Sequence, residues 1–203
     1  MGDDSWQRRK SRMTREKILE AAMDCLVEGG YSALGLREVL RRADVSRGAG
    51  HYHFNNKAEL VSALVEHVHE RRIEMFLNEY LCRIASEPNR EALWDSAELY
   101  GSTLATREFI AFLELSVAAR TDSELNEVFL PAVRKFDAIW MREMTGAFPQ
   151  WGERIEQMKI AADFVQSAYL GLLMNSELYD ADRRQKVRQV INDAVVMIYD
   201  RKG

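Results

Sequence analysis

The sequence is poor in proline, glycine and cysteine, which number three, eleven and two among its 203 residues. Proline and glycine interrupt regular elements, so their scarcity leaves room for long helices. No Val/Ile/Thr-rich run alternates with polar residues, and strands are therefore not expected. No apolar stretch reaches the roughly 18–20 residues of a membrane span, and no apolar segment follows the basic N-terminus as in a signal peptide. We expect an all-α, cytoplasmic protein.

Metal-binding and catalytic patterns are missing as well. The two cysteines, Cys25 and Cys82, stand in separate apolar helical segments, and we interpret them as reduced core thiols. No Gly-rich phosphate loop, nucleophile elbow or paired acid–base signature occurs, so we expect no enzyme. Histidines two residues apart point to different faces of a helix, so neither pair chelates well, and no metal or cofactor is expected. These pairs are His51 with His53 and His67 with His69.

Charge is distributed unevenly along the chain. Residues 1–57 hold eleven Lys/Arg and eight Asp/Glu, a net charge of +3, which leaves −7 for the remainder within the total of −4. A basic end on an acidic body suits a protein that docks one end on phosphates. A merely uneven solvated surface would look the same, so the charge counts only together with a motif.

That motif lies in residues 36–57, which indicate two short helices joined by a tight turn. The first helix carries apolar residues at helical spacing. Asp44 stands where the chain must turn, because a short polar side chain tolerates a left-handed backbone. Ser46 follows as the N-cap of a second helix that is nearly free of aliphatic residues. Such a helix does not fill a core and is typical of a recognition helix.

Arg47 is the best candidate for a base contact in this helix, because its guanidinium group can bond guanine with two donors. A contact to phosphate alone, or to solvent, is the main alternative. Gly48 and Ala49 would allow close approach to the groove, and Ala49 could touch a thymine methyl group. His51 and Tyr52 follow on the same helix.

Four segments carry a resemblance to the DNA-binding head of the tetracycline-repressor (TetR) family. They are TREKILEAA from Thr14, EGGYSALGLREV from Glu28, RRADVSRG from Arg41 and HFNNKAEL from His53. The resemblance covers about 50 residues. It implies an all-helical homodimer with a three-helix, helix-turn-helix DNA-binding head and a larger ligand-binding and dimerisation body. The implied partners are a palindromic double-stranded operator and an unknown small-molecule effector.

The resemblance also assigns residues and exposes departures. Lys57 matches a family phosphate contact, and Thr14 and Arg37 complete our set of DNA-binding candidates. The family usually has a phosphate-binding tyrosine where this chain has His51, so Tyr52 could serve instead.

Two more departures concern helix 2 and the recognition helix. A hydroxyl residue usually caps helix 2, and this chain has Leu34 and Gly35 there. Gly50 replaces a large apolar residue, and Leu40 replaces an alanine. We predict a size swap in which Leu40 fills the volume that Gly50 vacates; the alternative is that Gly50 simply weakens its helix.

The chain divides into a flexible basic arm at 1–13, a head at 14–56 and a body at 57–203. Thr14 is predicted to N-cap the first helix, and Gly29–Gly30 to end it. A helix of about 28 residues should start near Asn56, since apolar residues recur at helical spacing as far as Ile84. Further helices are expected at about 89–106, 107–120, 123–147, 152–178 and 181–200.

The body contains one anomaly, Glu114 in a helix that is otherwise almost wholly apolar. We predict a buried carboxylate that is paired with an arginine, protonated or directed into a ligand pocket. A pocket-facing carboxylate would favour a cationic or hydrogen-bond-donating ligand. The aromatic candidates for the pocket are Trp94, Phe112, Phe129, Trp140, Phe164 and Tyr169.

The last two helices have long apolar faces and are the predicted dimer interface, since two helices from each chain would form a four-helix bundle. Its candidate residues are Ile160, Phe164, Ala168, Leu172, Asn175, Val187, Val190, Ile191, Ala194, Val195 and Ile198. The hypothesis from sequence is therefore a transcriptional repressor that a small apolar ligand releases from its operator. The rivals are a DNA-binding protein controlled by a protein partner, and an enzyme or carrier without DNA affinity.

Overall fold

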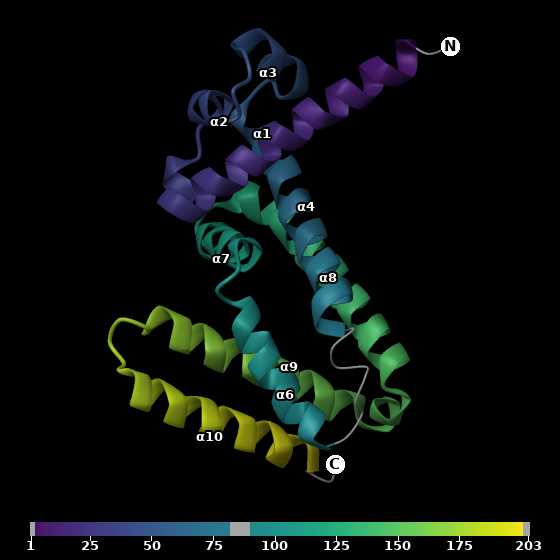
Figure 1. The fold of residues 1–203 in the computed structure, drawn as a ribbon, viewed down its shortest axis with the longest axis vertical. Helices are drawn as coiled ribbons and strands as arrows, with labels where there is room; N and C mark the ends of the chain where they lie inside the picture. The colour runs from purple at the N-terminus through teal and green to yellow at the C-terminus, as the bar shows by residue number, and fades with distance from the viewer. Residues whose placement is uncertain (1–2, 82–89, 201–203) are drawn as a thin grey trace. The chain divides into compact units, whose positions relative to one another are not determined.

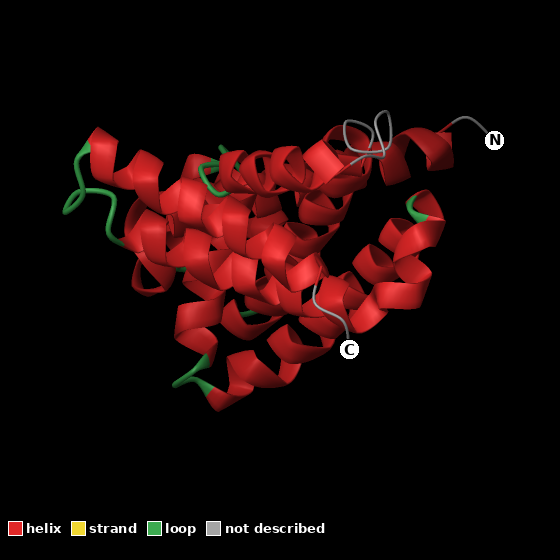
Figure 2. Cartoon of the chain, turned by 90° about the horizontal axis from the view of Figure 1, so that it is seen from below, coloured by secondary structure: helices red, strands yellow, loops and turns green. Residues whose placement is uncertain are grey.

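The computed structural model describes residues 3–81 and 90–200, without the side chains of residues 3–5, 79–80, 90–96 and 150–151. This part of the chain is helical and contains no strand (Figures 1 and 2). Within it, no helix is both long and apolar enough to cross a membrane. The all-α fold predicted from sequence is confirmed.

Contacts group the chain into two compact units, which do not follow the predicted boundary at residue 57. The first unit is Met1–Arg72 with Arg107–Phe136, and the second is Ile73–Thr106 with Asp137–Gly203. The first unit includes part of the predicted body because α7 packs along α1. Its helices are α1 (Asp3–Ala33), α2 (Leu36–Arg42), α3 (Arg47–His53), most of α4 (Lys57–Met75), α7 (Arg107–Ala119) and the start of α8 (Ser123–Ala147).

Helix α1 begins at Asp3 and runs through the segment predicted to be an irregular arm. Two predictions are therefore wrong: residues 3–13 are helical, and Thr14 is no N-cap. The Thr14 hydroxyl lies inside the helix and donates to the Lys10 carbonyl at 3.0 Å. Good helix formers in this segment favour the extension.

The end of helix 1 is where the sequence places it. Gly30 has φ +70°, a left-handed conformation that breaks the helical path before one more turn leads to Ala33. Beyond this kink, the core of the first unit is formed by fully buried side chains of α1, α2, α4 and α7. They include Ile18, Leu19, Met23, Leu26, Val39, Leu60, Leu64, Phe109 and Leu115. Cys25 lies in this core, and burial raises the pKa of its thiol. Cys82 lies outside the described residues.

The second unit consists of α6 (Arg90–Thr103), α9 (Ile155–Met174) and α10 (Ala181–Asp200), with a π-helix at Phe76–Leu81 and a 3-10 helix at Pro149–Arg154. Helix α10 packs on both α6 and α9. Gly101 of α6 lies against Tyr169 of α9, where a Cβ atom would be 2.8 Å from two carbons of the tyrosine ring. This glycine therefore allows α6 and α9 to approach closely.

Candidate nucleic-acid interface

The turn between α2 and α3 forms as its sequence predicts. Asp44 has φ 52°, the only left-handed non-glycine residue in the described chain. Ser46 then caps α3, because its hydroxyl oxygen accepts a hydrogen bond from the Ala49 amide at 3.3 Å. Local signals thus fix where α3 begins and how its first residues are presented.

Helix α3 has little contact with the rest of the first unit. Arg47, Gly48, Ala49, His51 and Tyr52 are all exposed, and Tyr52 is 80% exposed. The only buried residue of this helix is Gly50. A helix that buries one glycine contributes little to a core, and five of its seven side-chain positions remain available to a partner.

Gly50 contacts Leu40 of α2, as the predicted size swap requires. A Cβ atom at position 50 would lie 2.9 Å from Leu40 Cγ and closer still to both methyl groups. Leu40 is 4% exposed, so its side chain has little room to move aside. The leucine therefore occupies the space that a side chain at position 50 would need.

The remaining DNA-binding candidates lie on neighbouring elements. Lys57, the first residue of α4, is exposed, and its ammonium group lies 4.9 Å above the centre of the Tyr31 ring. Arg37 is exposed in the first turn of α2. That helix has Gly35 at its N-cap position and no side-chain cap, as predicted from the missing hydroxyl residue.

The other arginines of α2 are engaged by acids. Glu38 accepts hydrogen bonds from Arg41 at 2.6 Å and from Arg42 at 2.9 Å, and these bonds lower the pKa of its carboxyl group to about 2. Glu28 forms a second ion pair with Arg42. Part of the basic charge of the head is therefore neutralised within it.

Arg15 is a residue near α3 that the sequence reasoning did not select. Its guanidinium carbon lies 5.4 Å from the centre of the ring of Phe54, the residue directly after α3. Arg15 and burial together lower the pKa of the neighbouring His53, burial being the larger cause. No pattern in the sequence links residues 15 and 54, since the contact depends on how α1 crosses α3.

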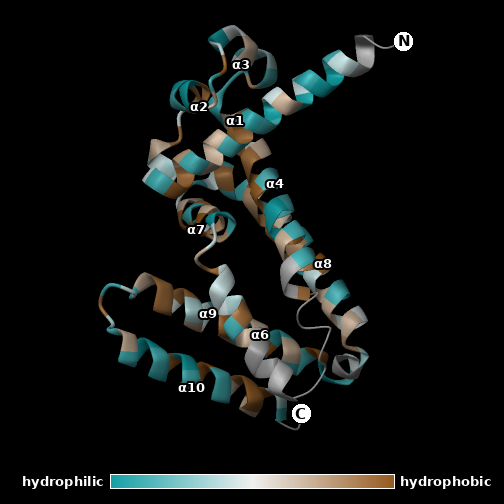
Figure 3. Cartoon of the chain, viewed as in Figure 1, coloured by the Kyte–Doolittle hydropathy of each residue, from teal (hydrophilic) through white to brown (hydrophobic). Residues whose placement is uncertain are grey.

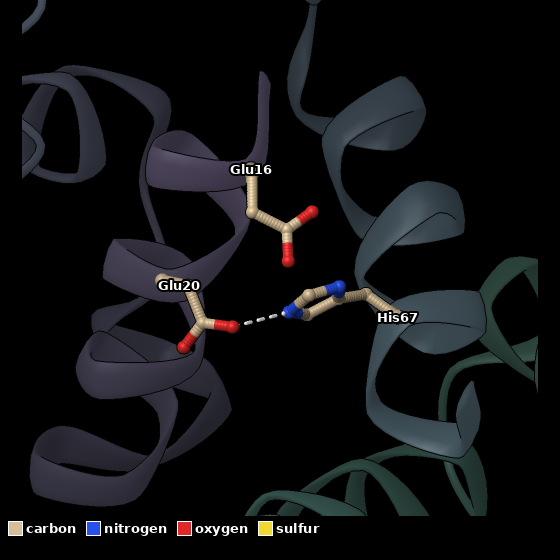
Figure 4. Close-up of side chains that lie close together, drawn as sticks. All are labelled: Glu16, Glu20 and His67. Atoms are coloured by element: carbon tan, nitrogen blue, oxygen red, sulfur yellow. Dashed lines mark hydrogen bonds and ion pairs between the residues drawn. The ribbon is translucent and has the colours of Figure 1, made fainter. Parts of the chain in front are cut away.

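A polar network ties α1 to α4 and α7, and Figure 4 shows its contact between Glu20 of α1 and His67 of α4. The Glu20 carboxylate accepts hydrogen bonds from His67 Nε2 at 2.9 Å, Arg71 Nη2 at 2.8 Å and Arg107 Nη1 at 2.7 Å. Burial alone would raise the pKa of Glu20, but these three hydrogen bonds outweigh it and hold the pKa at about 2. Glu20 therefore links α1 to α4 and α7, two helices that follow it in the chain.

Glu16, Glu20 and His67 also form the one group of potential metal ligands among the described residues, with ligand atoms within 4.8 Å of one another. Arg71 already pairs with both carboxylates, at 3.0 Å from Glu16 and 2.8 Å from Glu20. A metal ion would have to displace this guanidinium group. The geometry therefore fits an ion-pair network better than a metal site.

Three of the predicted pocket residues belong to the first unit, and two of them lie together around His69. His69 is 3% exposed, and its ring lies 5.7 Å from that of Phe112, 5.5 Å from that of Phe129 and 6.5 Å from that of Phe136. Its Nδ1 bonds to the Val65 carbonyl at 2.8 Å, and its Nε2 is buried without a partner. The chain thus places a neutral imidazole in an aromatic cluster.

Arg72 completes this cluster. It is 6% exposed, and its guanidinium carbon lies 3.7 Å from the centre of the Phe112 ring and 4.2 Å from that of Phe136. Burial is the main cause that lowers the pKa of His69 to about 4, and the nearby charge of Arg72 adds to it. No sequence pattern predicts that α4 contributes a histidine and an arginine to the aromatic residues of α7 and α8.

We expect His69→Phe to flatten the dependence of stability on pH. The pKa of His69 is about 4 in the folded chain against 6.5 for an unperturbed imidazole. As the pH is lowered, His69 of the unfolded chain is therefore protonated before His69 of the folded chain. Its neutral form contributes fully to the free energy of unfolding above about pH 6.5, and this contribution falls by up to about 3 kcal/mol as the pH approaches 4. Phenylalanine keeps a ring in the cluster and cannot titrate.

Urea unfolding at several values between about pH 7.5 and about pH 5 measures this effect, in a range above the titration of Glu20. His51→Phe, in the exposed recognition helix, is the matched control and should keep the pH dependence of the unchanged protein. An identical slope in both variants would show that His69 does not titrate as its surroundings indicate.

Glu114 does not lie in this cluster. It is half-buried, and a Cβ atom at Gly30 would lie 3.0 Å from its Oε2 atom. Glu114 follows Phe112 by two residues, so the two side chains point to different faces of α7. The premise of a fully buried carboxylate is therefore wrong, because this face of α7 meets the kink of α1, where a glycine leaves space.

The other pocket candidates belong to the second unit. Trp140 lies 6.4 Å from Phe76 between ring centres, and Phe164 is half-buried on α9. Tyr169 is 4% exposed, and its hydroxyl group is buried without a hydrogen-bond partner. The side chain of Trp94 lies outside the described residues. The predicted pocket residues are thus divided between the two units.

The predicted dimer helices exist as α9 and α10, but several interface residues are used within the chain. Leu172, Ile191 and Val195 are 8%, 3% and 3% exposed and pack inside the protomer, so little of their surface is left for a partner chain. The helices pack against each other, which buries one face of each. Asn175 caps α9, and its Nδ2 donates to the Gly171 carbonyl at 2.7 Å. Half-buried positions among the predicted set are Phe164, Ala168, Val187, Ala194 and Ile198.

A different apolar set is exposed on these helices. Val190 and Met197 of α10 are 65% and 70% exposed and lie seven residues apart, on one face. On α9 and the turn after it, Ile160, Met174 and Leu178 are 56%, 67% and 75% exposed. Of the residues predicted for the interface, Val190 and Ile160 are clearly exposed.

A capped, exposed helix held by two packed helices defines the class of helix-turn-helix proteins. Residues 18–64 match the family described as bacterial regulatory proteins, tetR family. The head of the chain is therefore the DNA-binding domain of this TetR family of transcriptional regulators. This domain agrees with the expectation of a regulator rather than an enzyme.

Relatives and solved structures agree with this assignment. Uncharacterized HTH-type transcriptional regulators of Mycobacterium bovis and Mycobacterium tuberculosis are 29% identical over 133 residues, which span 65% of this chain and 66% of the relatives. A transcriptional regulator of Streptomyces coelicolor has a similar fold, with a TM-score of 0.68 at 18% identity over 93% of this chain and 99% of that one. The multidrug binding protein EbrR, solved with proflavin, has a TM-score of 0.55 at 21% identity over 89% and 98%.

Proposed function

We propose that this chain is a dimeric repressor that docks α3 of each protomer in the major groove of a palindromic operator. The observation that carries the proposal is the surface of α3, which exposes Arg47, Gly48, Ala49, His51 and Tyr52 and buries only Gly50. In a helix-turn-helix protein, residues near the start of the second helix contact base edges and flanking residues contact phosphates.

The roles of individual residues follow from their positions. Arg47 is the first residue of α3, and an exposed guanidinium group there can bond a guanine with two donors. Gly48 leaves space beside it, since no atom lies within 4 Å of where its Cβ would be. Lys57 stands at the first turn of α4, where its charge adds to the amide groups of the helix N-terminus in binding a phosphate.

We further propose that a small apolar ligand releases the operator. The support is the aromatic cluster around His69 and the unpartnered Tyr169 hydroxyl, together with the likeness to EbrR, whose structure contains proflavin. The ligand would bind better to a conformation whose two heads are wrongly spaced for adjacent major grooves.

Control by a protein partner is the second candidate, and the exposed apolar residues of α9 and α10 favour it if they are not the dimer interface. A thermal-shift screen with apolar compounds separates the two. Stabilisation by a compound that also weakens operator binding supports control by a ligand. A chain that is monomeric in solution, with the apolar residues of α9 and α10 still exposed, supports control by a protein partner.

We expect Arg47→Ala to weaken binding of the preferred operator by roughly 10–100-fold and to relax base preference at one position of each half-site. Lys57→Ala should weaken all duplexes to a similar extent and lower the slope of log K against log salt, because it removes a phosphate contact. Duplexes selected from a random pool, measured by fluorescence anisotropy at several salt concentrations, test both. Absence of salt-sensitive binding to any selected duplex would overturn the proposed function.

A further inference from the structure

The N-terminal half of α1 buries none of the side chains that the structure describes. The helix begins at Asp3, yet its first buried residue is Ile18. From Trp6 to Lys17 every side chain is exposed or half-buried. Figure 1 shows this half of α1 extending past α2 and α3, and Figure 3 shows that it is mostly hydrophilic. At 1.5 Å per residue the extension is roughly 20 Å long.

One face of α1 changes from apolar to basic where the helix leaves the head. Leu26 and Leu19 are buried and lie seven residues apart. Continuing toward the N-terminus in steps of four, three and four residues, which stay on one helix face, leads to Arg15, Arg12 and Arg8. The face that carries leucine inside the head therefore carries arginine outside it.

This arginine face, formed by Arg8, Arg12 and Arg15, starts beside the recognition helix. The guanidinium carbon of Arg15 lies 5.4 Å from the centre of the Phe54 ring, and Phe54 directly follows α3. The face continues outward from this point for about 10 Å, the axial rise of seven residues. It thus begins at the residue that ends α3 and leads away from the head.

The positive charge of this face favours a polyanion as its binding partner. Residues 6–17 contain six Lys/Arg and one acidic residue, Glu16, a net charge of +5. All three members of the arginine face are exposed, and an apolar protein surface would have to bury their charges. Duplex DNA offers a regular row of phosphates at a spacing of about 3.4 Å along each strand.

We propose that the arginine face of α1 binds the phosphate backbone of duplex DNA next to the half-site that α3 reads. This inference rests on the proposed function, because it assumes that α3 docks on DNA. Its length adds contacts to about three base pairs at the outer edge of each half-site. The other candidate occupant, the acidic remainder of the chain, is an outcome of the test below.

The test compares two double variants of the full-length protein. Arg8→Gln with Arg12→Gln removes two charges from the arginine face. Lys10→Gln with Lys17→Gln removes two charges from the same helix; these lysines lie seven residues apart on the opposite face and are also exposed. In circular dichroism melting, both variants should be folded and should have the same melting temperature as the unchanged protein.

Anisotropy is measured with a selected operator duplex and with the same duplex shortened by about four base pairs at each end. The arginine variant should bind the long duplex roughly tenfold more weakly, lower the salt slope by about two per protomer, and no longer distinguish the two lengths. The lysine variant should lose less than about threefold and keep its preference for the longer duplex.

Equal losses in the two variants would overturn the assignment of a face, because they would reflect overall charge. No loss in the arginine variant, while Arg47→Ala still weakens binding, would overturn this inference and leave the proposed function standing. Tighter binding by the arginine variant would show that the face is held by the acidic part of the chain and is no DNA contact. Failure of the unchanged protein to bind any duplex would overturn both proposals.

Discussion

Val190→Arg and Met197→Arg, made together, should convert the dimer into folded monomers and weaken operator binding by about 100-fold or more. Both side chains are apolar, more than half exposed and on one face of α10. A chain of this family that pairs through α9 and α10 would bury this face in a four-helix bundle, where four arginines from two protomers would repel one another. A monomer contacts one half-site, so the gain from linking two half-sites is lost.

Sedimentation velocity gives the oligomeric state, and anisotropy with the selected operator gives the affinity. Gln185→Arg is the control, because this exposed residue lies on a different face of α10 and its variant should remain dimeric. Leu172→Arg would be a poor test, since Leu172 is 8% exposed within the protomer and a charge there would unfold the chain. An unaltered dimer in the Val190/Met197 variant would move the interface to another surface.

The local features of the head were predictable because each depends on residues close in sequence. Asp44 adopts its left-handed turn, Ser46 caps α3, and Gly30 breaks helix 1. The helices after it also followed their sequence signals. The predicted 123–147 and 181–200 agree with α8 (Ser123–Ala147) and α10 (Ala181–Asp200), since polar breaks and apolar spacing define both.

Features that depend on distant neighbours were not predictable in this way. Glu20 meets His67 and Arg107, which are 47 and 87 residues away in sequence. Glu114 was expected to be buried because its helix is apolar on nearly every side, but it is half-buried and lies beside Gly30 at the kink of α1. Leu172 was assigned to the dimer because a sequence shows that a face is apolar and does not show which helix covers it.

The arm at 1–13 was misjudged for a related reason. Its charge and lack of apolar residues suggested disorder, whereas the structure continues α1 to Asp3. A helix can extend beyond its packed part when the residues favour helix and when the preceding turns are already formed, because adding a turn costs less than starting one. Composition alone therefore underestimated the reach of α1.

The two glycines of α3 should respond in opposite ways to substitution by alanine. We expect Gly50→Ala to destabilise the protein by roughly 1–3 kcal/mol, because the added Cβ atom would overlap the Leu40 side chain. Gly48→Ala, two residues earlier in the same helix, should instead stabilise it by up to about 1 kcal/mol, since no atom lies within 4 Å of its Cβ position. Glycine-to-alanine substitutions at these two positions should thus change the free energy of unfolding in opposite directions, as measured by urea unfolding.

A double-mutant cycle then identifies Leu40 as the cause. Leu40→Ala alone should cost about 2–3 kcal/mol, because it removes a buried side chain and leaves a cavity beside Gly50. In this background Gly50→Ala should become stabilising, since the methyl group enters free space and alanine favours the helix more than glycine. Strict additivity of the two changes would reject the contact. A reversal of sign would show that the size of one residue in α2 decides which residue α3 carries at position 50, and with it how close the recognition helix lies to the head.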